Sequence, residues 1–279
     1  MKNTNFCIQC NLKGKPLIAN NIQLLRCSGC NLFWIADSLL GEDYYENIDP
    51  QLSKGKTNSR ISNTVDRIET IKRYVTLDNL CDIGCGEGIF LETLRDMGYK
   101  NLIGIEPGSI AQEYAKKHSL DIRQVTIGDC GHILEQNCIN TVTMFHVVEH
   151  LTEPIRALEV VFKYMKTGAR LVIETPDMSS YLLKKVQYEH EPVYSEHVYL
   201  FDSNNIEMIL KKVGFKIIKK GKRDFDPKNL TIRGSLERLG VVKPKKFQKT
   251  ACVFPASIVT TGPKYSGGAV SRTCFFSHF

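Results

Sequence analysis

The sequence lacks two kinds of apolar segment. Its 279 residues contain no run of 18 or more apolar residues, so it predicts no membrane-spanning helix. The first ten residues, MKNTNFCIQC, contain no apolar signal core, and we therefore expect the protein to remain in the cytoplasm. Tryptophan occurs only once, yet 42% of the residues are hydrophobic, which is enough to bury a sizeable core.

A strong excess of either charge is also missing. Lys and Arg number 37 and Asp and Glu 30, so the formal net charge is +7. Much of this excess lies late in the chain, in the segments 211–223 and 243–246. A mild positive charge is compatible with a nucleotide-linked substrate or RNA, but it more often serves solubility. Charge alone therefore selects no partner.

Strand and helix patterns alternate from Leu77 to about residue 220. LDNLCDIG and NLIGIE are typical of strands, and GIFLETLRDMG has apolar residues at helical spacing. A further helix is expected from about Ser62 to Tyr74. Strands separated by helices indicate βαβ units. The predicted fold class is α/β, with a Rossmann-like, doubly wound and mostly parallel sheet.

A glycine-rich segment, D-I-G-C-G-E-G at residues 82–88, follows the first of these strands and opens a helix. Glycines let such a turn be tight and let the backbone approach a ligand closely. The next strand ends in Glu106, whose carboxylate can accept hydrogen bonds from two ribose hydroxyls. NAD-binding proteins also have a glycine loop and an acid that binds the ribose, but their loops usually read G-x-G-x-x-G and bind a diphosphate. Asp82, two residues before the first glycine, suits a cationic aminoacyl-sulfonium ligand better. A tight turn without a ligand is the alternative.

Four segments together resemble the class I S-adenosylmethionine-dependent methyltransferase superfamily. They are D-I-G-C-G-E-G, G-I-E-P, G-D-C and M-F-H-V-V-E-H-L, and the resemblance covers residues 65–220. The chain is most similar to the small-molecule subgroup that includes ubiquinone-pathway O-methyltransferases and sugar methyltransferases. The resemblance implies O- or C-methylation of a small metabolite, such as a sugar or nucleotide-linked sugar, with S-adenosylmethionine as the cofactor.

The same resemblance implies a set of cofactor contacts. The glycine loop would meet the methionine part, Glu106 the ribose, Pro107 and Asp129 the adenine, and the end of the fourth strand the reacting methyl. The implied cofactor-binding residues are Asp82, Gly84, Cys85, Gly86, Glu106, Pro107, Asp129, Cys130, Phe145 and His146.

Two histidines are candidate catalytic residues. His146 ends the fourth strand, and ligands of open α/β sheets bind beside the carboxyl ends of strands. An imidazole there suits proton removal from a methyl acceptor, although it equally suits shaping the pocket. His197, in YSEHVYLF, is the second candidate, with fastening of a loop as its alternative. Glu149 and His150 are metal-type residues, and some relatives use a divalent ion nearby, but the spacing alone does not establish a site.

Four of the ten cysteines form two C-x-x-C pairs near the N-terminus. Cys7 and Cys10 make the first pair, Cys27 and Cys30 the second, and sixteen residues separate the pairs. This spacing predicts a closed tetrahedral zinc site with a structural role. A redox pair and an iron site are the alternatives. The other six cysteines show no ligand spacing and are interpreted as packing or loop residues.

The expected domain organisation has four parts. A zinc ribbon spans 1–40, a connector 41–64, the S-adenosylmethionine-binding domain 65–222, and an extension of uncertain structure 223–279. In that extension, TACVFPASIVT and SRTCFFSHF are each expected to supply an edge strand.

The methyl acceptor is the least determined part of this interpretation. Similar ribbons precede sugar methyltransferases and ribosomal RNA methyltransferases, but few basic residues lie on this one, and no N-P-P-[YF] motif follows the fourth strand. We therefore expect a small-molecule substrate, no membrane partner and no nucleic-acid partner. An RNA methyltransferase with a zinc module is the alternative, as is a catalytically idle binding protein. The oligomeric state stays open.

Overall fold

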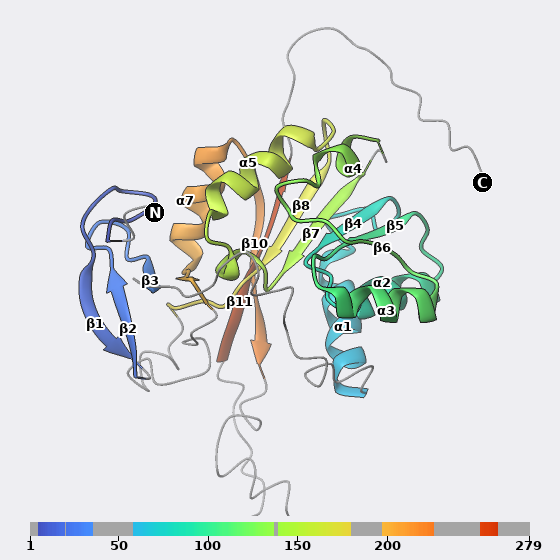
Figure 1. Cartoon of the computed structure of the whole chain (residues 1–279), viewed down its shortest axis with the longest axis horizontal. Coiled ribbons are helices and arrows are strands. Elements are labelled where there is room, and N and C mark those ends of the chain that lie inside the picture. Colours follow the sequence, from blue (N-terminus) through green and yellow to red (C-terminus); the bar gives the residue numbers. More distant parts are fainter. Residues whose placement is uncertain are drawn as a thin grey trace, which may run out of the picture.

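A computed structural model describes residues 5–19, 21–35, 58–136, 139–179, 197–225 and 252–261. Within these residues the chain forms two β-sheets, one of four strands in the order β1-β2-β3-β9 and one of seven in the order β10-β11-β8-β7-β4-β5-β6. Figure 1 shows the smaller sheet standing beside the larger one, which runs through the centre of the molecule. None of the described helices is long and apolar enough to cross a membrane.

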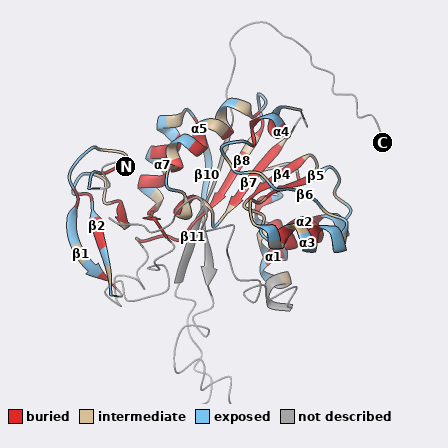
Figure 2. Cartoon of the chain, in the orientation of Figure 1, coloured by how far each residue is buried: buried red, intermediate tan, exposed pale blue. Residues whose placement is uncertain are grey.

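The larger sheet has a parallel centre. Five strands, β8-β7-β4-β5-β6, run parallel, which confirms the predicted Rossmann-like class. These strands are mostly apolar and buried because helices cover both faces of the sheet, as Figure 2 shows. The strands of this sheet are β4 (Leu80–Ile83), β5 (Leu102–Ile105), β6 (Asp121–Arg123), β7 (Thr141–Phe145), β8 (Arg170–Glu174), β10 (Lys216–Phe225) and β11 (Cys252–Thr261).

The C-terminal strand β11 lies inside the sheet. It pairs antiparallel with β8 on one side, where Val259 faces Val172, and antiparallel with β10 on the other. The expectation that TACVFPASIVT supplies an edge strand was therefore wrong, and part of the expected extension completes the main sheet. Local pattern cannot reveal such a position, because it depends on pairing with strands far away in the sequence. The segment SRTCFFSHF lies outside the described residues.

Helices cover the two faces of the sheet in two groups. Three pack on one face through an apolar cluster that includes Ile68, Leu91 and Ala115, and the other three pack on the opposite face (Figure 1). The first group is α1 (Asn58–Ile71), α2 (Ile89–Asp96) and α3 (Ser109–His118), and the second is α4 (Gly131–Gln136), α5 (Pro154–Tyr164) and α7 (Ser203–Val213). Only the six-residue α4, too short to show periodicity, was not expected from the sequence.

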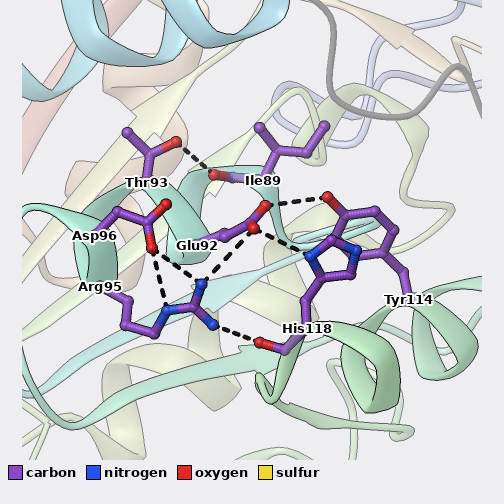
Figure 3. A network of polar contacts seen from close by, with 7 residues as sticks. All are labelled: Ile89, Glu92, Thr93, Arg95, Asp96, Tyr114 and His118. Carbon is purple, nitrogen blue, oxygen red and sulfur yellow. Dashed lines mark hydrogen bonds and ion pairs between the residues drawn. The ribbon is translucent and has the colours of Figure 1, made fainter.

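A polar network holds α2 against α3 (Figure 3). The carboxylate of Glu92, which is buried, accepts a hydrogen bond of 3.0 Å from the Tyr114 hydroxyl and lies 3.0 Å from Nδ1 of His118. The Tyr114 and His118 rings stack with centroids 3.9 Å apart, and Arg95 donates to the His118 carbonyl oxygen. Because α2 begins directly after Gly88, this network also fixes the helix that follows the glycine loop.

The smaller sheet joins the N-terminal residues to the main domain. Strand β9 comes from the chain between β8 and α7, and it pairs antiparallel with β3, so that Trp34 faces Tyr199 and Phe33 faces Leu200. The ribbon thus completes its sheet with two residues of the main domain. Its strands are β1 (Lys15–Ala19), β2 (Ile22–Arg26), β3 (Phe33–Ile35) and β9 (Tyr199–Leu200).

Candidate active site and cysteine cluster

The glycine loop turns sharply between β4 and α2. Gly84 has φ +71° and Gly86 φ +52°, a left-handed conformation that side chains rarely adopt. A Cβ atom on Gly84 would lie 2.4 Å from Cγ2 of Val147, whereas one on Gly86 would meet no atom within 4 Å. The loop therefore packs closely against the chain after β7 at Gly84, and it opens to free space at Gly86, as a ligand-binding loop requires.

Glu106 lies where the sequence places it, beside this loop. Its Oε2 accepts a hydrogen bond of 3.0 Å from the Gly86 N–H, and its Oε1 accepts one of 3.1 Å from the Gly108 N–H. The next residue, Pro107, accepts a hydrogen bond of 3.2 Å from the Gln124 side chain at its carbonyl oxygen. The ends of β4, β5 and β6 thus meet at one edge of the sheet.

Asp82 is buried beneath the loop. Thr143 Oγ1 donates a hydrogen bond of 2.6 Å to its carboxylate. Burial raises the pKa of Asp82 to about 7, although Thr143 and Arg67 lower it, and the Glu106 charge adds to the rise. Burial also raises the pKa of the neighbouring Cys85 thiol well above its ordinary value.

Asp129 lies at the surface, whereas its neighbour Cys130 lies in the core. Asp129 is exposed and accepts a hydrogen bond of 2.7 Å from Thr126 Oγ1. The Cys130 thiol is fully buried, donates to the Ile127 carbonyl oxygen at 3.1 Å, and burial raises its pKa to about 12. Any ligand contact of Cys130 therefore falls to its backbone.

His146 directly follows β7 and lies between two carboxylates. Its Nδ1 lies 3.3 Å from Glu149 Oε1 and its Nε2 lies 3.4 Å from Glu174 Oε1. Burial lowers the pKa of His146, but the two carboxylates outweigh it and raise that pKa to about 9. The residue has φ +56°, in the left-handed region that residues other than glycine adopt infrequently.

Sequence reasoning missed Arg67 and Glu174, which complete this group. Arg67 of α1 donates two hydrogen bonds to the Glu174 carboxylate, at 3.0 and 2.7 Å, and its guanidinium lies 4.4 Å from the centre of the Phe145 ring. The one available signal was Glu174 itself, a carboxylate that ends an otherwise apolar strand. Nothing local pointed to Arg67, which lies 107 positions earlier in the chain.

The second candidate, His197, lies beside His150. The two rings meet edge to face with centroids 4.7 Å apart, and His197 is only 7% exposed. One ligand atom from each of Glu149, His150 and His197 lies within 4.8 Å of the others. Burial raises the pKa of Glu149, but the three nearby histidines outweigh it and hold that pKa below its usual value. The structure thus brings both candidate histidines to one end of the sheet.

The four N-terminal cysteines form a compact cluster. Their sulfur atoms all lie within 4.8 Å of one another, and those of Cys7 and Cys30 are 3.6 Å apart. Both knuckles read C-x-x-C-N-L and have the same geometry: the N–H two residues after the first cysteine, at Gln9 and at Gly29, lies 3.4 Å from that cysteine's sulfur. All four cysteines are free thiols. This is a donor set that fits a tetrahedral thiolate-bound metal.

Comparisons with known proteins agree with this fold. A family model described as a methyltransferase domain matches residues 49–220. The chain belongs to this methyltransferase family. The predicted membership of the S-adenosylmethionine-dependent superfamily and the predicted enzyme class are thereby confirmed.

This methyltransferase resembles several curated proteins over part of their length. It is 30% identical over 127 residues to a ubiquinone biosynthesis O-methyltransferase of Hydrogenovibrio crunogenus, a match that covers 42% of this chain and 52% of that protein. It is 22% identical over 135 residues to a tRNA U34 carboxymethyltransferase of Helicobacter acinonychis, a match that covers 45% of this chain and 51% of that protein. An uncharacterised 37.1 kDa protein in transposon TN4556 of Streptomyces fradiae is 29% identical over 126 residues, covering 43% and 36%. The chain spans about half or less of the length of these relatives.

Solved structures share the fold of this methyltransferase. A S-adenosylmethionine-dependent methyltransferase from Archaeoglobus fulgidus superposes with a TM-score of 0.53 at 18% identity, covering 72% of this chain and 94% of that one. One from Thermotoga maritima, titled a possible histamine N-methyltransferase, gives 0.54 at 20% identity, covering 73% and 90%. At these identities the likeness establishes the fold alone.

Proposed function

We propose that this methyltransferase transfers a methyl group from S-adenosylmethionine to an oxygen or carbon atom of a small metabolite, such as a sugar or nucleotide-linked sugar. The observation that carries the proposal is the free space at Gly86, whose N–H bonds the Glu106 carboxylate, in a loop that packs at Gly84 against Val147, the neighbour of His146. A cofactor there has its methyl donor beside a group suited to proton transfer. The small-molecule acceptor is favoured because the described ribbon residues include only three basic ones, Lys13, Lys15 and Arg26.

The proposed cofactor contacts follow the strand ends. Bound S-adenosylmethionine supplies an electrophilic methyl group on a sulfonium centre. We assign the backbone of Gly84, Cys85 and Gly86 and the carboxylate of Asp82 to its methionine part, since a buried carboxylate attracts a cation. Glu106 is assigned to the ribose. The remaining assigned residues are Pro107, Asp129 and the backbone of Cys130 for the adenine, and Phe145 and His146 for the region of the methyl group.

His146 and His197 are the proposed groups at the acceptor. Methyl transfer to a hydroxyl requires the removal of a proton, a task that suits a positioned imidazole. The imidazole takes that proton only in its neutral form, whose share grows as the pH approaches its pKa of about 9, and Glu149 and Glu174 on either side stabilise the imidazolium that results. His197 lies close to this group through Glu149 and is assigned to substrate contact.

The cysteine cluster is proposed to hold a structural zinc ion. Zn–S bonds of about 2.3 Å in a tetrahedron separate neighbouring sulfurs by about 3.8 Å. The Cys7–Cys30 separation of 3.6 Å fits this value. A closed site of four thiolates leaves no position for chemistry, so its metal would stabilise the ribbon. Elemental analysis of the purified protein is expected to find one zinc ion per chain, lost in Cys10→Ser and retained in Cys81→Ala; an iron content or no metal would contradict the assignment.

Two measurements test the methyltransferase proposal. Calorimetry with S-adenosylmethionine is expected to show binding at one site per chain, and absence of binding would refute the proposal. With methyl-labelled cofactor, the protein is then incubated with a low-molecular-mass metabolite extract and, separately, with total tRNA. Label in the metabolites supports the proposed acceptor class. Label in tRNA supports the RNA alternative, and label in neither, with cofactor binding intact, supports the idle binding protein.

A further inference from the structure

A pocket with a volume of about 400 Å³ lies at the edge of the larger sheet opposite to the glycine loop. It is bounded by the residues that follow α1, by the residue before β7 and by the first residue of β8. Its lining includes three basic side chains and no acidic one, so the pocket concentrates positive charge. The basic and polar side chains that line it are Lys72, Arg73, Tyr74, Thr76, Asn140 and Arg170.

Hydrogen bonds near the strand starts fix the floor of this pocket. The Arg170 N–H donates one of 2.9 Å to the Asn140 carbonyl oxygen, and the Thr141 hydroxyl donates one of 2.6 Å to the Thr76 carbonyl oxygen. Gly168 also lines the pocket, and a Cβ atom there would meet no atom within 4 Å. The pocket therefore has a fixed floor and an open wall.

Two of the three cations lack an acidic partner within the described part of the chain. Lys72 makes an ion pair of 2.6 Å with Glu69, but neither Arg73 nor Arg170 pairs with a described carboxylate. Arg170 is also half-buried, so water and salt screen its charge less than that of an exposed arginine. Because like charges that line one pocket repel each other, a bound anion would stabilise this arrangement.

We propose that this pocket binds the phosphate groups of a small molecule that carries a diphosphate. A guanidinium donates two parallel hydrogen bonds to a phosphate, and an ammonium adds a point charge. Pockets for small molecules have volumes from about 300 Å³ upward, so this one accommodates such a ligand. Tyr74, which is 37% exposed, offers aromatic surface to the uncharged part of the ligand, and Lys219 Nζ lies 5.9 Å from the centre of its ring.

The pocket is separate from the proposed cofactor and acceptor sites. Arg170 begins β8, whereas Glu174, the partner of His146, ends that strand. A strand of five residues spans about 15 Å. A phosphate bound by Arg170 is therefore too far from His146 for methyl transfer, and the ligand of this pocket is neither the cofactor nor the methyl acceptor. The inference does not depend on the proposed function.

Calorimetry with adenosine diphosphate and with inorganic pyrophosphate tests the site. The full chain is first saturated with S-adenosylmethionine, so that the adenine nucleotide does not enter the glycine loop. We expect one adenosine diphosphate or pyrophosphate per chain, bound at least tenfold more weakly by Arg73→Gln and by Arg170→Gln, because each variant loses charge-assisted hydrogen bonds.

Arg156→Gln is the matched control, since it changes an exposed arginine of α5 that pairs with Glu153, and it should keep the wild-type affinity. Absence of binding by both probes, or wild-type affinity in both pocket variants, would overturn the proposal.

Two further anions distinguish a diphosphate from other ligands. An RNA strand is bound by a basic groove that continues along several nucleotides, whereas Arg73 and Arg170 line one pocket. We therefore expect a single-stranded RNA of about twelve nucleotides, and likewise citrate, to bind at least tenfold more weakly than pyrophosphate. RNA that binds more tightly than pyrophosphate and loses affinity in the same two variants would replace the proposal with an RNA surface. Citrate that binds as tightly as pyrophosphate would overturn the selectivity for phosphate.

Thermal unfolding without a ligand separates binding from a structural role of Arg170. Because Arg170→Gln removes a repelling charge, the variant is expected to unfold at the wild-type temperature or above it, and a lower temperature would overturn the proposal in favour of a structural arginine. Retained S-adenosylmethionine binding in both pocket variants shows that they are folded. Pyrophosphate binding by a wild-type chain that binds no S-adenosylmethionine would refute the proposed function and leave the pocket standing.

Discussion

The carboxyl edge of the large sheet has two halves that are built differently. At the ends of β4, β5 and β6, the glycine loop offers backbone groups and open space, and its main side-chain partner is Glu106. At the ends of β7 and β8, charged side chains contact one another directly, with His146 between two carboxylates and Arg67 on one of them. We call these the cofactor half and the charged half.

The difference shows how each half obtains its geometry. The cofactor half takes its shape from backbone conformation within one strand–loop–helix unit, and a ligand is needed to fill it. The charged half takes its shape from ion pairs that form without a ligand and join three segments far apart in the chain, at Arg67, at residues 146–149 and at Glu174. Disturbing the charged half should therefore cost stability, whereas disturbing the cofactor half should cost affinity.

The largest effect is expected at Arg67. Arg67→Met leaves the Glu174 carboxylate, 1% exposed, without its bidentate partner. A buried charge that loses its partner destabilises a fold by about 4 kcal/mol. Urea unfolding of the variant should show this loss, and Arg73→Met, at an exposed arginine just after the same helix, should show almost none. Equal losses of unfolding free energy in the two variants would show that the Arg67–Glu174 ion pair makes no specific contribution to stability.

The next effect concerns affinity. Glu106→Ala removes the carboxylate assigned to the ribose hydroxyls, and two charge-assisted hydrogen bonds of about 1.5 kcal/mol each correspond to roughly a hundredfold weaker binding. Calorimetry measures the affinity for S-adenosylmethionine. Glu113→Ala, at an exposed acid on α3, is the control. Unchanged affinity in Glu106→Ala would show that the ribose contact is misplaced.

Two alanine substitutions in one loop sharpen the comparison further. Gly84→Ala places a Cβ atom 2.4 Å from Val147, whereas Gly86→Ala meets no atom. Both pay the cost of a left-handed conformation, so the clash alone should make Gly84→Ala less stable than Gly86→Ala by about 2 kcal/mol. Thermal unfolding gives the difference. Gly86→Ala should instead weaken cofactor binding. A Gly86→Ala variant that is less stable than Gly84→Ala would contradict the free space at Gly86 and the ligand position proposed there.

The smallest effect is a pH dependence at Asp82. Because its pKa is raised to about 7 in the folded protein, its carboxyl group is mostly protonated at pH 6 and mostly ionised at pH 8. The ionised form attracts the cationic cofactor, so affinity should rise about tenfold between these pH values. Calorimetry on the wild type and on Asp82→Asn separates this rise from the titration of the cofactor itself, which both proteins share. Parallel curves for the two proteins would exclude Asp82 as the group responsible.

The sequence by itself determined the parts that local physics encodes. Glycines at 84 and 86, an acid at the end of the next strand and alternating periodicities predict the parallel sheet and the cofactor loop, because each depends on neighbours in the chain. The paired C-x-x-C knuckles belong here as well, and the structure gathers their four sulfurs as the spacing predicts.

Only the tertiary structure decided the rest. The position of β11 inside the sheet, the Arg67–Glu174 ion pair, the pairing of β9 with the ribbon and the meeting of Glu149, His150 and His197 all join segments separated by intervening strands and helices. Such contacts depend on how complete elements pack, and no local pattern records that. The proposed cofactor loop can therefore be predicted from one stretch of sequence, whereas the charged half exists only once the chain has folded.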